Sequence, residues 1–238
     1  MRACICLPTY NERENLEPML EALRGVIGEG DRVLVIDDNS PDGTGDLADR
    51  LAEALPFVDV LHRPRKAGLG PAYLAGFRQA LAAGAELVLE IDCDFSHDPA
   101  DVPRLLAAAE RADVVLGSRY VAGGGVRDWG VVRRAISAGG SLYARAILGI
   151  PVRDPTGGFK CFRRRVLETI DLDAIASKGY AFQIETTYRA LRAGFRVVEI
   201  PIAFADREAG RSKMSRAIVL EAIWKVPALR LAALAGRL

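Results

Sequence analysis

The sequence predicts an α/β fold in which helices cover both faces of a central, mostly parallel sheet. Short apolar runs typical of buried strands alternate with longer segments whose apolar residues recur at helical spacing. Polar segments rich in Asp, Asn, Gly and Pro separate the two kinds of segment. This alternation is typical of parallel sheets whose strands are joined by helices.

The first half of the chain shows the alternation most regularly. Each expected strand ends at a polar segment, and each expected helix begins after one, as at Thr44, which follows an Asp42-Gly43 turn. Strands are expected at residues 3–7, 32–36, 58–62, 87–91 and 114–116, and helices at residues 15–26, 44–54, 71–83 and 101–111.

The second half is less regular. Helices are expected at residues 129–148, 181–193 and 213–238, and extended segments at residues 157–162 and 196–200. Gly139-Gly140 is a weak point of the first of these helices, and Pro227 should break the last one. We therefore expect one domain at residues 1–212, including 129–148, followed by a basic amphipathic helical appendage at residues 213–238.

Length, charge and cysteine content exclude several classes of protein. The 238 residues suit one large domain or one domain with appendages, and the net charge of +1 gives no reason to expect nucleic acid as a partner. No apolar run approaches the roughly 18–20 residues that cross a bilayer, and Met1-Arg2 leads directly into a strand, so no signal peptide is expected. Cys4, Cys6, Cys93 and Cys161 follow no metal-binding spacing. Because Cys4 and Cys6 would point the same way from one strand, we expect buried, reduced thiols.

Asp92-Cys93-Asp94 is the most informative motif of the chain. It follows the apolar run 87–91, which is typical of a strand covered on both faces. Two carboxylates at the end of a buried strand need a compensating cation, and a divalent metal that also carries a diphosphate is the simplest candidate. The motif therefore predicts an enzyme with a nucleotide-linked donor. Asp94 is the first expected metal ligand, Asp92 could bind metal or ribose, and Ser96 could add an oxygen.

Other polar segments should meet this motif at one edge of the sheet, because ligands of parallel sheets bind outside the carboxyl ends of the strands. Tyr10 could stack on a base, and Glu12 and Asp38 could accept hydrogen bonds from ribose or base. A Rossmann dehydrogenase is not expected, because residues 7–12 contain no glycine where G-x-G-x-x-G is required, and no Walker A sequence is present. A metal and basic side chains should therefore meet the phosphates.

Four motifs occur together and in order: Pro8-Thr9-Tyr10-Asn11-Glu12, residues 37–44, residues 92–99 and Gly117-Ser118-Arg119-Tyr120. Their combination resembles glycosyltransferase family 2 and, within it, the dolichol and polyprenol monophosphate mannose synthases. The resemblance covers roughly residues 3–215. It implies the GT-A fold, GDP-mannose as donor, Mg²⁺ or Mn²⁺ as cofactor, and a polyprenyl or dolichyl phosphate as acceptor.

The resemblance also implies roles for individual residues. Pro8, Tyr10 and Glu12 match positions that hold the guanosine, and Ile36 and Asp38 match further nucleotide contacts. Asp92, Cys93 and Asp94 match the metal and diphosphate segment, whereas Ser96 stands where some relatives have glutamine. Arg207 and Lys213 match contacts of the donor diphosphate, and Arg119, Arg133 and Ser137 are placed for the acceptor phosphate.

The expected reaction is one direct displacement that inverts the α-linked mannose to a β-linked product. The acceptor phosphate is already anionic, so no strong general base is required, and His97 is expected to be a structural hydrogen-bonding residue. Asp94, Arg119, Arg133 and Ser137 are the expected catalytic residues. The alternatives are the same fold with UDP-glucose or another nucleotide sugar, and a nucleotide-sugar-binding regulator without catalysis.

Two segments could bring the chain to a lipid acceptor. Residues 129–148 contain arginines and no acid, and residues 213–238 contain five basic residues against Glu221 alone, together with Trp224. A basic amphipathic helix with a tryptophan suits an anionic membrane surface, and the alternative is ordinary packing of these helices on the domain. We expect a peripheral protein at the cytoplasmic face of a membrane, with a membrane protein as a possible partner.

Overall fold

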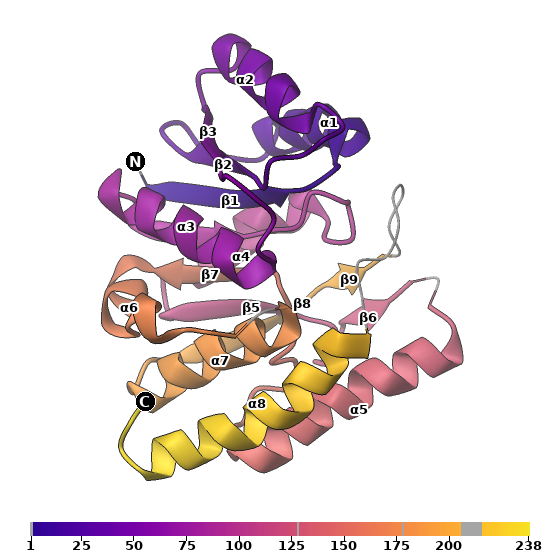
Figure 1. Cartoon of the computed structure of the whole chain (residues 1–238), viewed down its shortest axis with the longest axis vertical. Coiled ribbons are helices and arrows are strands. Elements are labelled where there is room, and N and C mark those ends of the chain that lie inside the picture. Colours follow the sequence, from indigo (N-terminus) through magenta and orange to yellow (C-terminus); the bar gives the residue numbers. More distant parts are fainter. Residues whose placement is uncertain (1, 128, 178, 206–215) are drawn as a thin grey trace.

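The computed structural model describes residues 2–127, 129–177, 179–205 and 216–238. Its centre is a seven-stranded sheet in the order β3-β2-β1-β4-β7-β5-β8 (Figure 1). Strand β7 runs antiparallel to its neighbours β4 and β5, and the other neighbouring strands are parallel, which confirms the mostly parallel sheet. The strands are β1 (Ala3–Thr9), β2 (Arg32–Asp37), β3 (Val58–His62), β4 (Leu87–Glu90), β5 (Val114–Ser118), β7 (Lys160–Arg163) and β8 (Val197–Pro201), with β6 (Gly125–Val126) and β9 (Ala203–Phe204) pairing separately.

Helices cover both faces of the sheet, as the sequence predicts. Side chains of α1, α2 and α4 pack with Ala3, Ile5 and Leu7 in one core, and side chains of α3, α6 and α7 pack with Cys4 and Cys6 in the other. The helices are α1 (Arg13–Arg24), α2 (Thr44–Ala54), α3 (Leu69–Ala82), α4 (Val102–Ala108), α5 (Val131–Leu148), α6 (Arg164–Thr169), α7 (Gly179–Arg192) and α8 (Arg216–Leu234), with short 3₁₀ turns η1 (Pro99–Asp101) and η2 (Leu172–Ala174).

The alternation of β1 explains why two cores form. Successive side chains of a strand point to opposite faces, so its odd-numbered apolar residues face α1 while Cys4 and Cys6 face α3. All four cysteines are buried and free.

The strands and helices predicted for the first half of the chain are present, with ends shifted by a few residues. One prediction for the second half is wrong, because Pro227 lies inside an unbroken α8. Proline lacks the N–H that would bond the carbonyl of Ile223 four residues earlier. The Tyr143 hydroxyl of α5 donates to that carbonyl instead, at 2.9 Å, so the helix continues with its carbonyl satisfied. Gly139 and Gly140 likewise lie within the continuous helix α5.

Helices α5 and α8 lie side by side at one end of the molecule (Figure 1). Val226, Leu229 and Ala233 of α8 are buried in the core that also contains Ala144 and Leu148 of α5. Their outer sides expose a set of large apolar residues: Val131, Val132, Ile136, Leu142 and Ile147 on α5, and Ile223, Trp224, Leu231 and Leu234 on α8. In the described part of the chain, no helix combines the length and the apolar character that crossing a membrane requires.

The order of the strands defines where a ligand can enter. Strand β1 lies between β2 and β4, and this change of direction in the strand order is where parallel α/β sheets open a crevice at their carboxyl ends. Pro8 to Glu12 follow β1 there, and Asp92 to Asp94 follow β4.

Candidate active site

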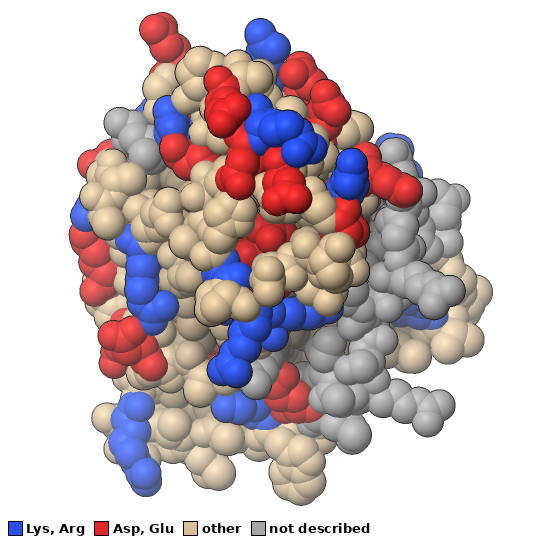
Figure 2. Space-filling model, turned by 45° about the horizontal axis from the view of Figure 1, so that its top comes forward, with Lys and Arg blue, Asp and Glu red and all other residues tan. Residues whose placement is uncertain are grey.

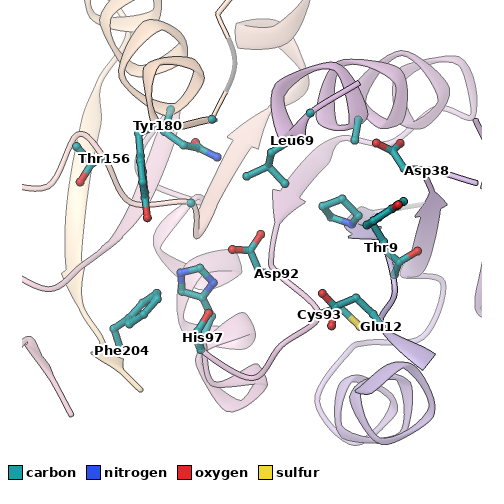
Figure 3. A pocket seen from close by; sticks show the side chains of 18 of the residues that line it. Thr9, Glu12, Asp38, Leu69, Asp92, Cys93, His97, Thr156, Tyr180 and Phe204 are labelled. Atoms are coloured by element: carbon teal, nitrogen blue, oxygen red, sulfur yellow. The ribbon is translucent and has the colours of Figure 1, made fainter. Parts of the chain in front are cut away.

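A cavity of about 460 Å³ opens at the carboxyl ends of β1 and β4, a size typical of small-molecule sites. Figure 3 shows Thr9, Glu12 and Asp38 on one side of Asp92, and His97, Phe204, Thr156 and Tyr180 on the other. We call these sides the β1–β2 end and the β9 end. The lining also includes Pro8, Tyr10, Lys66, Gly68, Leu69, Ala72, Cys93, Ser96, Arg119, Trp129, Arg133, Gly158, Gly179, Gln183 and Glu221.

The loop after β1 supplies an aromatic face and a carboxylate to the β1–β2 end. The Lys66 ammonium lies 3.8 Å above the centre of the Tyr10 ring, a cation–π contact that holds the ring at the rim. Glu12 is buried and its carboxylate accepts from the Asn15 side chain at 2.8 Å, while its backbone N–H donates to the Thr44 hydroxyl at 3.1 Å. These bonds tie the start of α1 to the start of α2.

Asp38, which follows β2, is the second buried carboxylate of this end. Burial raises the pKa of Asp38, whereas its ion pair with Arg63 acts in the opposite direction. The backbone N–H of Ala67 also donates to it, at 3.4 Å. The loop after β3 therefore covers the Asp38 carboxylate and places the Arg63 guanidinium against it.

The acidic motif after β4 lies in a tight turn in the middle of the cavity. The Tyr73 hydroxyl of α3 donates to Asp92 at 3.1 Å, and Asp94 accepts from the backbone N–H and the hydroxyl of Ser96 at 3.1 and 2.6 Å. Phe95, between them, has φ +58°, a conformation that non-glycine residues rarely adopt. Asp92, Cys93 and Ser96 line the cavity, and Asp94 is buried next to them in sequence without lining it.

A buried polar network lies next to this motif. The Lys160 ammonium donates to the Gln183 backbone carbonyl at 2.7 Å, to the Gln183 side-chain oxygen at 2.6 Å and to the Thr186 hydroxyl at 3.3 Å. Burial lowers the pKa of Lys160 to about 8. Burial also raises the pKa of Glu90 to about 7, and the nearby Lys160 charge opposes this shift.

His97 lies on the cavity wall beside Asp92 (Figure 3). Its ring packs between those of Phe159 and Phe204, with both centroids 5.0 Å away. Burial lowers the pKa of His97 to about 4, so the ring is neutral at neutral pH. The sequence predicts a structural hydrogen-bonding histidine, but its Nδ1 atom has no hydrogen-bond partner among the described residues, and aromatic packing holds the ring.

Arg119, directly after β5, is a buried guanidinium at the β9 end. Its Nε donates to Asp154 at 2.7 Å, and its Nη2 donates to Asp154 at 2.6 Å and to Thr156 at 2.9 Å. Burial favours the neutral form, yet the bonds and charge of Asp154 keep the pKa of Arg119 above its usual value. Within the described residues no hydrogen bond reaches Nη1, so its two N–H groups remain for an anion.

Helix α5 adds a second cation to this end. The Arg133 guanidinium lies 4.2 Å from the centre of the Trp129 ring, and both residues line the cavity. Ser137, one turn further along α5, accepts from the Tyr120 hydroxyl at 2.7 Å and lies outside the lining.

The structure thus brings most of the predicted site residues around one cavity. Ile36 is an exception, because its side chain is buried in the core against α3. Arg207 and Lys213 lie outside the described residues, although the chain passes the cavity directly before residue 206, where the Ala205 N–H donates to the Ser96 carbonyl at 3.1 Å.

Several site residues in the second half of the chain were not predicted from the sequence. Thr156, Gly158, Tyr180, Gln183 and Phe204 line the cavity, and Asp154 pairs with Arg119. One local signal for these residues is the polar, glycine-rich stretch 154–158, which lies at the start of an apolar run. The other site loops lie at the ends of such runs. The loop after β3, which supplies Lys66 to the lining, belongs to one of the polar segments expected at this edge of the sheet.

Known proteins similar to this chain are glycosyltransferases. The model of the family described as "Glycosyl transferase family 2" matches residues 4–171. An undecaprenyl-phosphate mannosyltransferase of Micrococcus luteus is 52% identical over 233 residues, which cover 98% of this chain and 96% of the relative. A polyprenol monophosphomannose synthase of Mycolicibacterium smegmatis is 50% identical over 227 residues, which cover 94% of this chain and 85% of the relative.

Solved structures show the fold. A glucosyl-3-phosphoglycerate synthase from Mycobacterium tuberculosis, in complex with Mn²⁺, UDP and glucosyl-3-phosphoglycerate, has a TM-score of 0.63 at 22% identity, covering 99% of this chain and 79% of that one. A mannosyltransferase from Pyrobaculum calidifontis, in complex with GDP-Man and Mn²⁺, has a TM-score of 0.57 at 18% identity, covering 99% and 74%. These likenesses confirm the predicted GT-A fold.

Proposed function

This chain belongs to glycosyl transferase family 2, and we propose that it transfers mannose from GDP-mannose to a polyprenyl (dolichyl-type) monophosphate. The observation that carries the proposal is the order in which acidic, aromatic and basic side chains follow one another along one cavity. The acidic motif at Asp92 lies between the β1–β2 end, which offers Tyr10 and Asp38 to a nucleotide, and the β9 end, which offers Arg119 to a phosphate. The names of the two relatives support mannose and a polyprenyl phosphate as the substrates.

The oxygen ligands at the acidic motif fit Mg²⁺ or Mn²⁺. Both are hard ions, and Mg²⁺ in particular is usually held by one or two carboxylates together with substrate phosphates and water. Within the described residues, no group of three His, Cys, Asp or Glu side chains could hold a metal by itself. Asp92 and Asp94 would therefore hold the ion together with the diphosphate, whose negative charge it would neutralise. The Ser96 hydroxyl donates to Asp94 at 2.6 Å, so its oxygen lone pairs could still add a ligand to the ion.

The remaining residues would hold two anions close together. At the β1–β2 end, Tyr10, Glu12 and Asp38 would bind the guanosine. Arg119 would meet the acceptor phosphate through Nη1, since Asp154 and Thr156 occupy the other side of its guanidinium. Arg133 and Ser137 of α5 would extend this site, and Arg207 and Lys213 remain predicted contacts of the donor diphosphate.

The proposed reaction is one in-line displacement. An oxygen of the acceptor phosphate forms a bond to the anomeric carbon while the bond from that carbon to the donor diphosphate breaks, and the electron pair leaves with GDP. The acceptor oxygen is anionic at neutral pH, so no residue has to remove a proton from it. Catalysis would rest on positioning and on stabilising the charge of the leaving diphosphate.

The acceptor is a lipid, so the enzyme would work as a peripheral protein on the cytoplasmic face of a membrane. The exposed apolar residues of α5 and α8 support this placement, because α5 carries Arg133 at the cavity rim and the face of α8 continues from it. Figure 2 shows acidic side chains gathered over the opposite end of the molecule, where α1 and α2 lie. A membrane protein partner could bind the same face.

Turnover tests the proposal. Radiolabelled GDP-mannose, polyprenyl phosphate and Mg²⁺ or Mn²⁺ should yield a labelled lipid, and EDTA or Asp94→Ala should reduce its formation by at least about 100-fold. Asp173→Ala is the matched control, since Asp173 is exposed and pairs with Arg78. Full activity of Asp94→Ala would contradict the metal assignment.

UDP-glucose assayed in parallel tests the donor. Preferred turnover of UDP-glucose would replace GDP-mannose in the proposal. Tight nucleotide-sugar binding without any product would favour a regulator.

A further inference from the structure

Three described residues of the cavity wall have a buried polar atom that makes no hydrogen bond of good geometry: Gln183 (Nε2), His97 (Nδ1) and Trp129 (Nε1). Gln183 of α7 and His97, which follows the acidic motif, are the more deeply buried of the three, and each is 2% exposed. Buried polar groups are nearly always hydrogen-bonded, so two such atoms in one cavity indicate a polar ligand.

The orientation of the Gln183 amide is fixed by its neighbour. Lys160 can only donate, so the atom that it meets at 2.6 Å must be the amide oxygen. The NH₂ group is therefore the part of the Gln183 amide that Lys160 does not contact through a hydrogen bond. It lies near the Glu90 carboxylate, a contact that opposes the rise of the Glu90 pKa although its geometry is poor. One N–H group is directed to Glu90, and the second can serve a ligand.

Gly158 lies against both side chains. A methyl group added to Gly158 would lie 3.4 Å from the Gln183 Nε2 and 3.9 Å from the His97 Cε1, which are ordinary contact distances. Gly158 also lines the cavity. Because residue 158 has no side chain, the cavity keeps the volume of a methyl group next to both residues.

The place of this pair along the cavity indicates its ligand. His97 lies next to Asp92, on the side towards the β9 end (Figure 3). With the nucleotide at the β1–β2 end and the diphosphate at Asp92, the next group of a nucleotide sugar is its hexose. A hexose offers hydroxyls that both accept and donate, which an amide N–H and an imidazole nitrogen can both bond.

We propose that Gln183 and His97 bind hydroxyls of the transferred hexose beside Gly158 and so determine which sugar is transferred. The inference rests on the proposed function, because that function places the nucleotide and the diphosphate. A site that hydrogen-bonds a hydroxyl discriminates strongly against a sugar that presents it differently, since its own buried polar groups are then left unpaired.

Calorimetric titration of the full chain with GDP and with GDP-mannose, both with Mn²⁺, separates the hexose from the nucleotide. Gln183→Met and His97→Phe should each weaken GDP-mannose binding about tenfold, as expected for one lost buried hydrogen bond. Gly158→Ala should weaken it by about the same factor, because the added methyl group occupies space next to both side chains that the hexose would fill. Binding of GDP should stay within about twofold of the wild type. Gln79→Met and His62→Phe are matched controls, because Gln79 lies on α3 outside the cavity and His62 pairs with Asp49 at the surface.

The Gly158→Ala variant keeps both polar groups and adds only contacts of ordinary length, so it tests the site even where Gln183→Met unfolds. Unchanged GDP-mannose binding in Gly158→Ala, or an equal loss of GDP and GDP-mannose binding, would overturn the inference. If the wild type binds another nucleotide sugar instead, the proposed donor is wrong. The loss of binding of that nucleotide sugar, compared with the loss for its parent nucleotide in the same variants, then supports or overturns the hexose site independently.

Discussion

Arg119, the residue proposed to bind the acceptor phosphate, is held in place by a buried carboxylate. A buried guanidinium needs a counter-ion, and Asp154, which is fully buried, supplies it through two side-chain bonds. The Arg119 backbone N–H donates to the same carboxylate at 2.9 Å, so main chain and side chain are fixed together. Asp154 therefore acts as a positioning residue that leaves the Nη1 group of Arg119 in a single orientation.

Replacing Asp154 tests this role. Asp154→Asn keeps the shape but removes the charge, and we expect mannosyl transfer to fall by about 100-fold with an increased KM for the polyprenyl phosphate. Because the variant leaves a buried cation without its counter-ion, the free energy of unfolding should fall by about 3 kcal/mol. Initial rates over a range of acceptor concentrations and urea denaturation measure the two effects. Asp173→Asn, on the surface, should change neither, and an unaltered acceptor KM in Asp154→Asn would contradict the positioning role.

A site residue could be predicted from the sequence where a local pattern marks its position and its side chain has suitable chemistry. Asp92 and Asp38 follow apolar runs, and that local pattern is enough to place both at the carboxyl edge of a sheet. No local pattern marks Asp154, because its role is to pair with Arg119, which lies 35 residues earlier in the chain. Gln183 lies inside a helix, and only the fold turns it towards the cavity.

At the scale of elements, α5 and α8 stabilise each other at a proline. Pro227 leaves the Ile223 carbonyl without its helical donor, and the Tyr143 hydroxyl replaces that donor. The sequence signal for a break at Pro227 was correct in its local chemistry. It failed because a side chain from another helix satisfies the freed carbonyl.

A double-mutant cycle measures this bond. Tyr143→Phe should reduce the free energy of unfolding by about 1 kcal/mol, the usual contribution of one hydrogen bond. In a Pro227→Ala background, the alanine N–H can bond the Ile223 carbonyl, so the same substitution should have a smaller effect. Chemical denaturation of the four proteins gives the coupling energy, and equal effects of Tyr143→Phe in both backgrounds would argue against the proposed compensation.

The outer face of α5 and α8 gives a second prediction at this scale. Trp224 is 78% exposed and Val132 72%, and neither lines the cavity. Buried in a lipid interface, each large apolar side chain would contribute about 1.5–3 kcal/mol. We therefore expect a variant with Val132, Ile136 and Trp224 replaced by serine to bind anionic vesicles at least about tenfold more weakly in flotation assays.

Charge on the same face should add to this binding. Arg134→Ser should weaken vesicle binding more at low salt than at high salt, because salt screens the attraction to anionic lipid. Arg50→Ser, on α2 at the opposite end of the molecule, is the matched control. Equal binding of the triple serine variant and the wild type would show that this face does not meet the membrane.

At the scale of the whole molecule, the second half of the chain completes a site that the first half begins. The regular alternation of the first half predicts its strands and helices well, because strand–helix–strand units are local. Strand β7 enters the sheet antiparallel between β4 and β5, and its short run carries no signal for that direction. Its insertion places Lys160 opposite Glu90 in the middle of the molecule.

This buried pair makes a prediction for the stability of the whole protein. The pKa of Glu90 is raised from 4.5 to about 7 by burial, so between these pH values the folded state binds more protons than the unfolded state, and stability falls as pH rises. The pKa of Lys160 is lowered from 10.5 to about 8, so between these values the unfolded state binds more protons, and stability rises with pH. The pair should therefore give the folded state a minimum of stability between about pH 7 and 8.

The Glu90→Gln/Lys160→Met double variant, in which neither group titrates, provides the reference. We expect the free energy of unfolding of the wild type minus that of the double variant to pass through a trough near pH 7–8. The trough should be on the order of 2–3 kcal/mol deep, from about 1.4 kcal/mol per unit of pKa shift. Urea denaturation with EDTA from pH 5 to 10 measures the difference, and the subtraction cancels the titration of the buried thiols, which both proteins share. A flat difference over this range would show that Glu90 and Lys160 keep ordinary pKa values in the folded protein.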